Sequence, residues 1–257
     1  MDDQIKTCDE NELQLAAAVQ EALLTDDVPR CKCGRMVLKN LMSGQVGGDF
    51  YHFRSLGEGQ IAFTMGDVEG HGMGAALLMS MILGMLRAER RDFRRPSSLV
   101  GSLNDMLIRL GGKLTRPITC SLIYGVLDLP SGILLYVNAG HPRPIISNRG
   151  DGEIRQLPPT TMLLGVQGGV MPESCHQFRQ KDRLVLFTDG IVDAWGADAQ
   201  LFSEGRLQDI VRQMSQDEPE DLAEKVFAEL KAFCGDTRPT DDQTLVVIDF
   251  DKISEEG

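Results

Sequence analysis

Four stretches of the sequence place an aspartate where an apolar run gives way to a loop. They are Asp49 in VGGDFY, Asp67 in IAFTMGDVEGHG, Asp189 in LVLFTDGIVDAW, and the adjacent Asp241 and Asp242 in TDDQTLVVIDF. A carboxylate beside a buried strand is costly unless something pairs with it, so we expect the four places to meet in one site. Oxygen ligands without histidine or cysteine favour a hard cation such as Mg²⁺ or Mn²⁺. The pattern indicates a metal-dependent enzyme.

The sharpest local signal is GDVEGHGMGAALL, in which an apolar strand ends at Asp67 and a helix begins near Gly72. Asp67 can bridge two cations through its two oxygens, and the backbone carbonyl of Val68 can supply a further ligand. The N-terminus of the helix favours a phosphate group. Asp67 or Glu69 could instead cap the helix, and the other aspartates could lie in ordinary turns. One shared site accounts for all of them together.

Composition narrows the classes of partner. The 257 residues include 26 Lys and Arg against 38 Asp and Glu, a formal charge of −12, which argues against nucleic acid and anionic membranes. Cys31 and Cys33 lie too close together for the usual zinc spacing, and we expect reduced thiols. The start MDDQIKTCDE is no secretory signal, and the longest apolar stretch, residues 75–86, is too short to span a bilayer. We expect a soluble, cytoplasmic protein.

The histidines are weaker candidates for chemistry. His141 in NAGHPRP is expected to fix a loop by hydrogen bonding to the backbone, whereas the role of His71, next to the glycine-rich loop, is left open. The sequence contains no GxSxG, no Walker-type GxxxxGK[ST] and no GxGxxG that opens a helix after a strand. With only 5% aromatic residues, a nucleotide enzyme is also disfavoured.

Apolar periodicity predicts helices at residues 10–24, 72–91, 97–110, 203–214 and 219–233. Runs rich in β-branched residues predict strands at 31–42, 48–55, 60–66, 119–129, 132–139, 143–147, 152–157, 183–187 and 243–250. Residues 158–172 are rich in Pro and Gly and are expected to form an irregular loop. No linker divides the chain. We predict one α+β domain, with two packed antiparallel sheets and helices outside them.

Six motifs in order, VGGDFY, GDVEGHGMGAALLM, TCSLIYGVLD, YVNAGHPRPII, LVLFTDGIVDA and DDQTLVVI, resemble those of the PPM-type serine/threonine protein phosphatases. The similarity is greatest to the SpoIIE/RsbU branch and runs from about Leu15 to Phe250. It implies an α-β-β-α sandwich with two divalent cations, Mn²⁺ or Mg²⁺, at its edge. In this family a hydroxide that bridges the metals attacks the phosphorus in line, and no phosphoenzyme forms.

The resemblance also implies ligands. Asp67 matches the carboxylate that bridges both metals, and Val68 the residue that adds its backbone carbonyl. Asp189 and one residue of the pair Asp241 and Asp242 match the ligands of the other metal, and the motif favours Asp241 over Asp242.

Two further acidic residues and the N-terminal segment are not among these metal ligands. Asp49 matches an outer carboxylate, which acts through water or in a third metal site. Glu69 stands where this branch usually has a small or uncharged residue, and we expect it to orient metal-bound water or to protonate the leaving serine oxygen. Residues 1–24 form an amphipathic helix in place of the sensory domain that such enzymes often carry. We expect this helix to bind a second copy or an activating partner, and residues 25–257 to form the phosphatase domain.

The implied substrate is phosphoserine or phosphothreonine on a small bacterial regulatory protein. By resemblance, this is a STAS-type anti-sigma-factor antagonist in a partner-switching pathway, or another phosphoprotein of such a pathway. The alternative is a catalytically silent module of the same fold that sequesters a signalling partner. A silent relative would be expected to have lost at least one of Asp67, Asp189 and Asp241, and all three are present.

Overall fold

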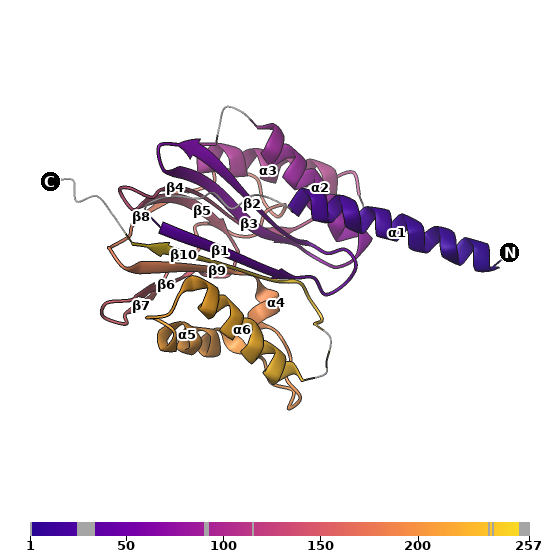
Figure 1. Ribbon diagram of the computed structural model, residues 1–257. Helices are drawn as coiled ribbons and strands as arrows, with labels where there is room; N and C mark the ends of the chain where they lie inside the picture. Colours follow the sequence, from indigo (N-terminus) through magenta and orange to yellow (C-terminus); the bar gives the residue numbers. More distant parts are fainter. Residues whose placement is uncertain are drawn as a thin grey trace.

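The computed structural model describes residues 2–24, 34–89, 93–114, 116–235, 237 and 239–251. Two five-stranded antiparallel sheets lie face to face, and helices cover their outer faces (Figure 1). The predicted α+β sandwich is therefore confirmed. Cys31 and Cys33, which are expected to be reduced thiols, lie outside the described residues.

The first sheet departs from the order of its strands in the sequence, whereas the second follows it. The first sheet has the order β1 (Gly34–Leu41), β10 (Gln243–Phe250), β9 (Asp182–Phe187), β6 (Ile145–Asn148) and β7 (Ile154–Gln156). The second has the order β2 (Asp49–Gly57), β3 (Gln60–Val68), β4 (Cys120–Asp128), β5 (Ile133–Ala139) and β8 (Ser174–Gln177). The last strand of the chain thus pairs with the first, which brings the segment before β10 to the same end of the sandwich as the start of β2.

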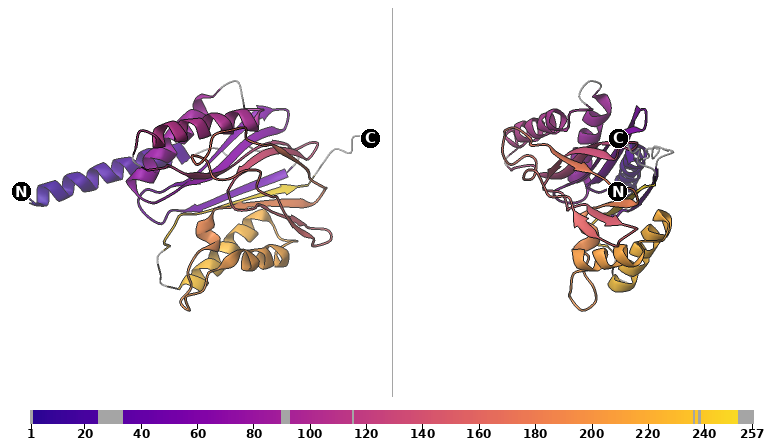
Figure 2. Two further views of the ribbon diagram at one scale, coloured as in Figure 1. Left: turned by 180° about the vertical axis from the view of Figure 1, so that it is seen from behind. Right: turned by 90° about the vertical axis from the view of Figure 1, so that its left-hand side faces the viewer.

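Helices α2 (Met73–Ala88) and α3 (Pro96–Gly111) cover the second sheet, and α5 (Ser203–Gln213) and α6 (Pro219–Cys234) cover the first. A one-turn helix, α4 (Asp189–Val192), follows β9 directly. Helix α1 (Asp2–Leu24) contacts α2 and β2, and most of its length extends away from the sandwich (Figure 2). Within the described residues, no helix is both long and apolar enough to cross a bilayer.

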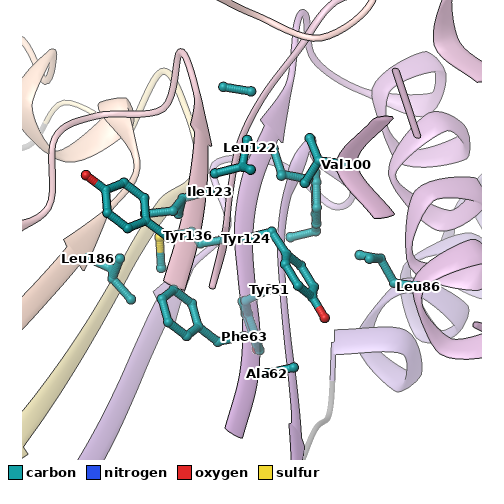
Figure 3. Packing of buried hydrophobic residues seen from close by; sticks show 14 of the residues in the cluster. Tyr51, Ala62, Phe63, Leu86, Val100, Leu122, Ile123, Tyr124, Tyr136 and Leu186 are labelled. Atoms are coloured by element: carbon teal, nitrogen blue, oxygen red, sulfur yellow. The ribbon is translucent and has the colours of Figure 1, made fainter. Parts of the chain in front are cut away.

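The apolar core has one layer between the sheets and further layers under the helices. In β10, Val246 and Ile248 belong to the cluster between the sheets, whereas Val247 packs toward α5 and α6. In β4, Ile123 points toward the facing sheet and Tyr124 toward the helices (Figure 3). Alternate side chains of a strand point to opposite faces, so strands covered on both faces appear in the sequence as continuous apolar runs.

Most predicted elements are present with shifted ends, and two elements were not predicted. Strand β8 is a short edge strand with the polar sequence SCHQ, which carries little β signal. Helix α4 starts at the Asp–Gly pair of TDGIVDAW, for which an ordinary turn is the alternative to a metal-site aspartate in the sequence analysis. The first helix begins at Asp2 instead of residue 10.

Candidate metal-binding pocket

Strands β2 and β3 place Asp49 directly opposite Asp67. Opposed residues of an antiparallel pair project from the same face, so both carboxylates point to the edge where the two sheets meet. Asp49 is only 1% exposed, and its Oδ2 accepts hydrogen bonds from the hydroxyls of Thr188, at 2.8 Å, and Thr244, at 2.6 Å. Burial raises the pKa of Asp49 well above its usual value, although the Thr244 hydrogen bond opposes this.

Asp67, Asp189 and Asp241 line one cavity of about 640 Å³. They come from the end of β3, the start of α4 and the segment before β10, which are far apart in the sequence. Glu69 lines the same cavity and is exposed, and its carboxylate accepts a hydrogen bond from the Thr119 hydroxyl. The structure therefore brings together four of the residues that sequence analysis singles out.

The carboxylates of this cavity destabilise one another's ionised forms. Burial, followed by the charges of Asp189, Asp241 and Asp242, raises the pKa of Asp67 to about 8. Burial and the charge of Asp241 raise the pKa of Asp189, and burial raises that of Asp241. A divalent cation would relieve this repulsion, because it favours the charged carboxylates.

Gly48 lets the backbone approach this group of oxygens closely. A Cβ atom on Gly48 would lie 2.7 Å from the carbonyl oxygen of Val68 and 2.8 Å from Oδ1 of Asp67. The side chain of Val68 is fully buried in the core, so its carbonyl is the group available at this edge. The carbonyl and the carboxylate lie on the same side of Gly48, which gives an oxygen-only donor set that suits a hard cation.

The acidic side chains of the pocket are not tightly clustered. Among the described residues, no three His, Cys, Asp or Glu residues converge closely enough to hold one metal as they lie. The residues fit Mg²⁺ or Mn²⁺ by the chemistry of their donors.

Asp242 has a different environment from its neighbour Asp241. Its Oδ1 accepts hydrogen bonds from the backbone N–H of Ser43 at 2.8 Å and from the hydroxyl of the same residue at 2.9 Å, and its Oδ2 accepts one from the backbone N–H of Gly48 at 3.0 Å. A Cβ atom on Gly47 would lie 1.6 Å from Oδ2 of Asp242. Asp242 is 2% exposed, and both of its oxygens hold the loop that leads into β2.

Three of the four histidines, His71, His141 and His176, occupy different environments. His141 lines the cavity but is buried. Its Nδ1 lies 3.0 Å from the hydroxyl oxygen of Ser121, its backbone N–H donates to Asn138, and burial lowers its pKa to about 3. His71 is exposed, and its charge lowers the pKa of Asp241. His176 lies on β8 and packs edge-on against a phenylalanine ring.

Sequence reasoning missed Asp193 and the threonine partners of Asp49. Asp193 lines the same cavity, and its charge helps to raise the pKa of Asp189. The spacing of four residues between Asp189 and Asp193 is the available signal, because such residues share one face of a helix. Thr188 and Thr244 gave no signal, since their contact with Asp49 depends on how the two sheets pack.

Comparison with known proteins matches residues 57–251 to the family model of Stage II sporulation protein E, SpoIIE. The phosphoserine phosphatase RsbU of Bacillus subtilis (strain 168) is 25% identical over 239 residues, which is 93% of this chain and 70% of RsbU.

Solved structures give the same fold. The SiaA-PP2C domain of Pseudomonas aeruginosa superposes with a TM-score of 0.80 at 21% identity, over 96% of this chain and 99% of that domain. RsbX, solved in complex with magnesium, superposes with a TM-score of 0.60 at 14% identity, over 87% of this chain and 98% of RsbX.

Proposed function

The chain belongs to the SpoIIE family of PPM-type serine/threonine protein phosphatases, and we propose that it hydrolyses phosphoserine or phosphothreonine on a regulatory protein. One observation carries the proposal. Asp67, Asp189 and Asp241 reach one cavity from three separate segments, and burial together with neighbouring carboxylates raises the pKa of Asp67 and Asp189. Divalent cations bound there would stabilise the charged forms of these carboxylates.

In this proposal, Asp67, Asp189, Asp241 and the carbonyl of Val68 hold two divalent cations, Mg²⁺ or Mn²⁺. The magnesium complex of RsbX supports a hard cation. When bound, the cations would supply an activated water and neutralise charge on the phosphoryl group. Asp49 is assigned the outer role, since it is buried and its carboxylate already accepts hydrogen bonds from Thr188 and Thr244.

Asp242 is assigned to loop positioning, because its two oxygens already accept hydrogen bonds from Ser43 and Gly48. Glu69 is assigned to the substrate side of the cavity. It is exposed at the rim, and the Thr119 hydroxyl orients its carboxylate. From there Glu69 either orients the attacking water or gives a proton to the leaving serine oxygen.

The substrate we propose is a STAS-type anti-sigma-factor antagonist, in line with the similarity to RsbU, and the setting is cytoplasmic. The acidic character of the chain, with a formal charge of −12, fits a protein partner better than a nucleic acid.

We also propose that α1 binds a second copy or an activating partner. Leu15 is 66% exposed and Val19 is 51% exposed on the outer side of this helix. On the inner side, the Gln20 side chain donates to the carbonyl of Gly47 at 2.9 Å and accepts from the N–H of Gly47 at 3.1 Å. Gly47 precedes Gly48, so a partner that moves α1 would act on the loop beside the cavity.

The direct test is hydrolysis of p-nitrophenyl phosphate with Mn²⁺, with Mg²⁺ and with a chelator, for the wild type and for Asp67→Asn. We expect metal-dependent turnover that the substitution reduces by at least about 100-fold. Turnover that persists in the chelator, or in the variant, would contradict the proposal. Binding of Mn²⁺ in calorimetry without any turnover would indicate either a form that awaits a regulator or the silent binding module.

A further inference from the structure

A second cavity, of about 570 Å³, adjoins the carboxylate pocket. The two cavities share Glu69, Gly70 and Thr119 as lining residues, so they open side by side across this edge. Apart from Arg116, the remaining walls of the second cavity are uncharged and largely apolar. They comprise Leu78 from α2, Pro117 and Ile118 before β4, and Gly165 and Val166 from the loop after β7. We call Leu78, Ile118 and Val166 the apolar groove.

The loop that carries Val166 is fixed to the body of the protein. The side chain of Asn104, itself 1% exposed, accepts a hydrogen bond from the N–H of Gly165 at 2.8 Å and donates one to the same loop at 2.9 Å. Leu164 and Cys120 exchange two backbone hydrogen bonds. A Cβ atom on Gly165 would lie 1.8 Å from the carbonyl oxygen of Ile118. The segment that sequence analysis expects to be irregular is therefore held against the start of β4.

This fixed loop exposes apolar side chains toward solvent. Val166 is 55% exposed, Met162 54% and Leu163 38%, whereas Ile118 at the floor of the groove is 5% exposed. Exposed apolar side chains that cluster on a fixed surface mark a contact site. Leu163 also lines the carboxylate pocket, so the apolar surface reaches from one cavity to the other.

We propose that the apolar groove binds an apolar side chain of the phosphoprotein substrate, close in sequence to the phosphorylated residue. This inference rests on the proposed function, because it requires the phosphorylated side chain to enter the carboxylate pocket. An extended chain advances about 3.3 Å per residue, so a residue two or three positions away reaches an adjoining cavity. The continuity of the two cavities favours the substrate over a second copy of this chain as the occupant.

The test uses synthetic phosphoserine peptides in matched pairs, which carry Leu or the neutral polar residue Asn at each position around the phosphoserine in turn. With Mn²⁺, the wild type should hydrolyse the Leu peptide with a kcat/KM about tenfold higher at one position, because an apolar pocket discriminates by that order. In Val166→Asp this ratio between the two peptides should fall to about one. Each variant's peptide rates are divided by its own p-nitrophenyl phosphate rate, so that a general loss of activity cancels.

Val170→Asp is the matched control. Val170 lies on the same loop and is 86% exposed, and its substitution should leave the Leu preference intact. If the wild type hydrolyses p-nitrophenyl phosphate but treats every peptide pair alike, the groove proposal is wrong and the phosphatase stands. If the wild type does not hydrolyse p-nitrophenyl phosphate, the result contradicts the proposed phosphatase function, and with it the groove proposal that rests on it. If Val166→Asp instead dissociates a dimer in analytical ultracentrifugation and keeps the Leu preference, the groove is an interface between copies.

Discussion

The carboxylate of Asp242 accepts a hydrogen bond from the backbone N–H of Gly48 at 3.0 Å, and so joins the segment before β10 to the loop that leads into β2. Asp241, one residue earlier, lines the carboxylate pocket instead. Two adjacent aspartates with the same side chain therefore have different surroundings. Their substitution should separate metal binding from stability.

Asp241→Asn should reduce metal-dependent turnover by at least about 100-fold and leave the stability of the metal-free protein unchanged or higher, because a repelling charge is removed. Asp242→Asn should lower the free energy of unfolding by about 1–3 kcal/mol, because it weakens charge-assisted hydrogen bonds of a buried carboxylate. Calorimetric Mn²⁺ titration and urea denaturation in chelator measure the two effects. The reverse assignment of the two phenotypes would show that Asp242 is the ligand.

The charge of Asp67 should make the metal-free protein less stable as pH rises. The pKa of Asp67 is about 8 in the folded chain and 3.8 without its environment. Its neutral form is therefore favoured by folding, and this contribution is present below about pH 4 and is lost as pH rises through 8. In chelator, Asp67→Asn should melt at a higher temperature than wild type at pH 8, with a smaller gap at pH 5.

Millimolar Mn²⁺ should reverse that order, because only the wild type keeps the full set of ligands and gains the binding free energy. Thermal melts of both proteins at the two pH values, with and without Mn²⁺, complete the comparison. If the two metal-free proteins melt alike at pH 8, burial and the neighbouring carboxylates do not raise the pKa of Asp67.

The aspartates were predictable from the sequence because each lies at or next to one end of a strand, and strand ends gather at sheet edges. The strands themselves were predictable because β10 and β9 have both faces covered and so form unbroken apolar runs. The different environments of Asp241 and Asp242 were not predictable from the pattern. They depend on which loop lies beside each side chain, and Ser43 is almost 200 positions away in the chain.

The apolar groove was also not predictable from the sequence. Composition marks residues 158–172 as a loop rich in Pro and Gly, and it gives no indication that Asn104 of α3 fixes this loop. Long-range hydrogen bonds from a buried side chain to a loop backbone leave no periodic signal in the sequence.

The contact between α1 and the cavity loop can be tested at Gln20. Gln20→Ala removes the two hydrogen bonds to the backbone of Gly47 and should lower the free energy of unfolding by about 1–3 kcal/mol. Because Gly47 adjoins Gly48, we also expect weaker Mn²⁺ binding in calorimetry. Val19→Ala on the exposed side of the same helix should change neither quantity. A Gln20→Ala protein with unchanged Mn²⁺ affinity would show that α1 does not act on the cavity.

Glu69 can be assigned a role by comparing two leaving groups. If Glu69 protonates the leaving oxygen, Glu69→Gln should slow the hydrolysis of a phosphoserine peptide by about 100-fold. The same variant should change p-nitrophenyl phosphate turnover little, because nitrophenolate leaves without a proton. If Glu69 orients the attacking water, both substrates should slow together. Thr119→Val, which removes the hydroxyl that donates to Glu69, should change the rates in the same direction and by less. Unchanged rates for both substrates in Glu69→Gln would exclude both roles, and would place Glu69 among the solvent-facing charges of the rim.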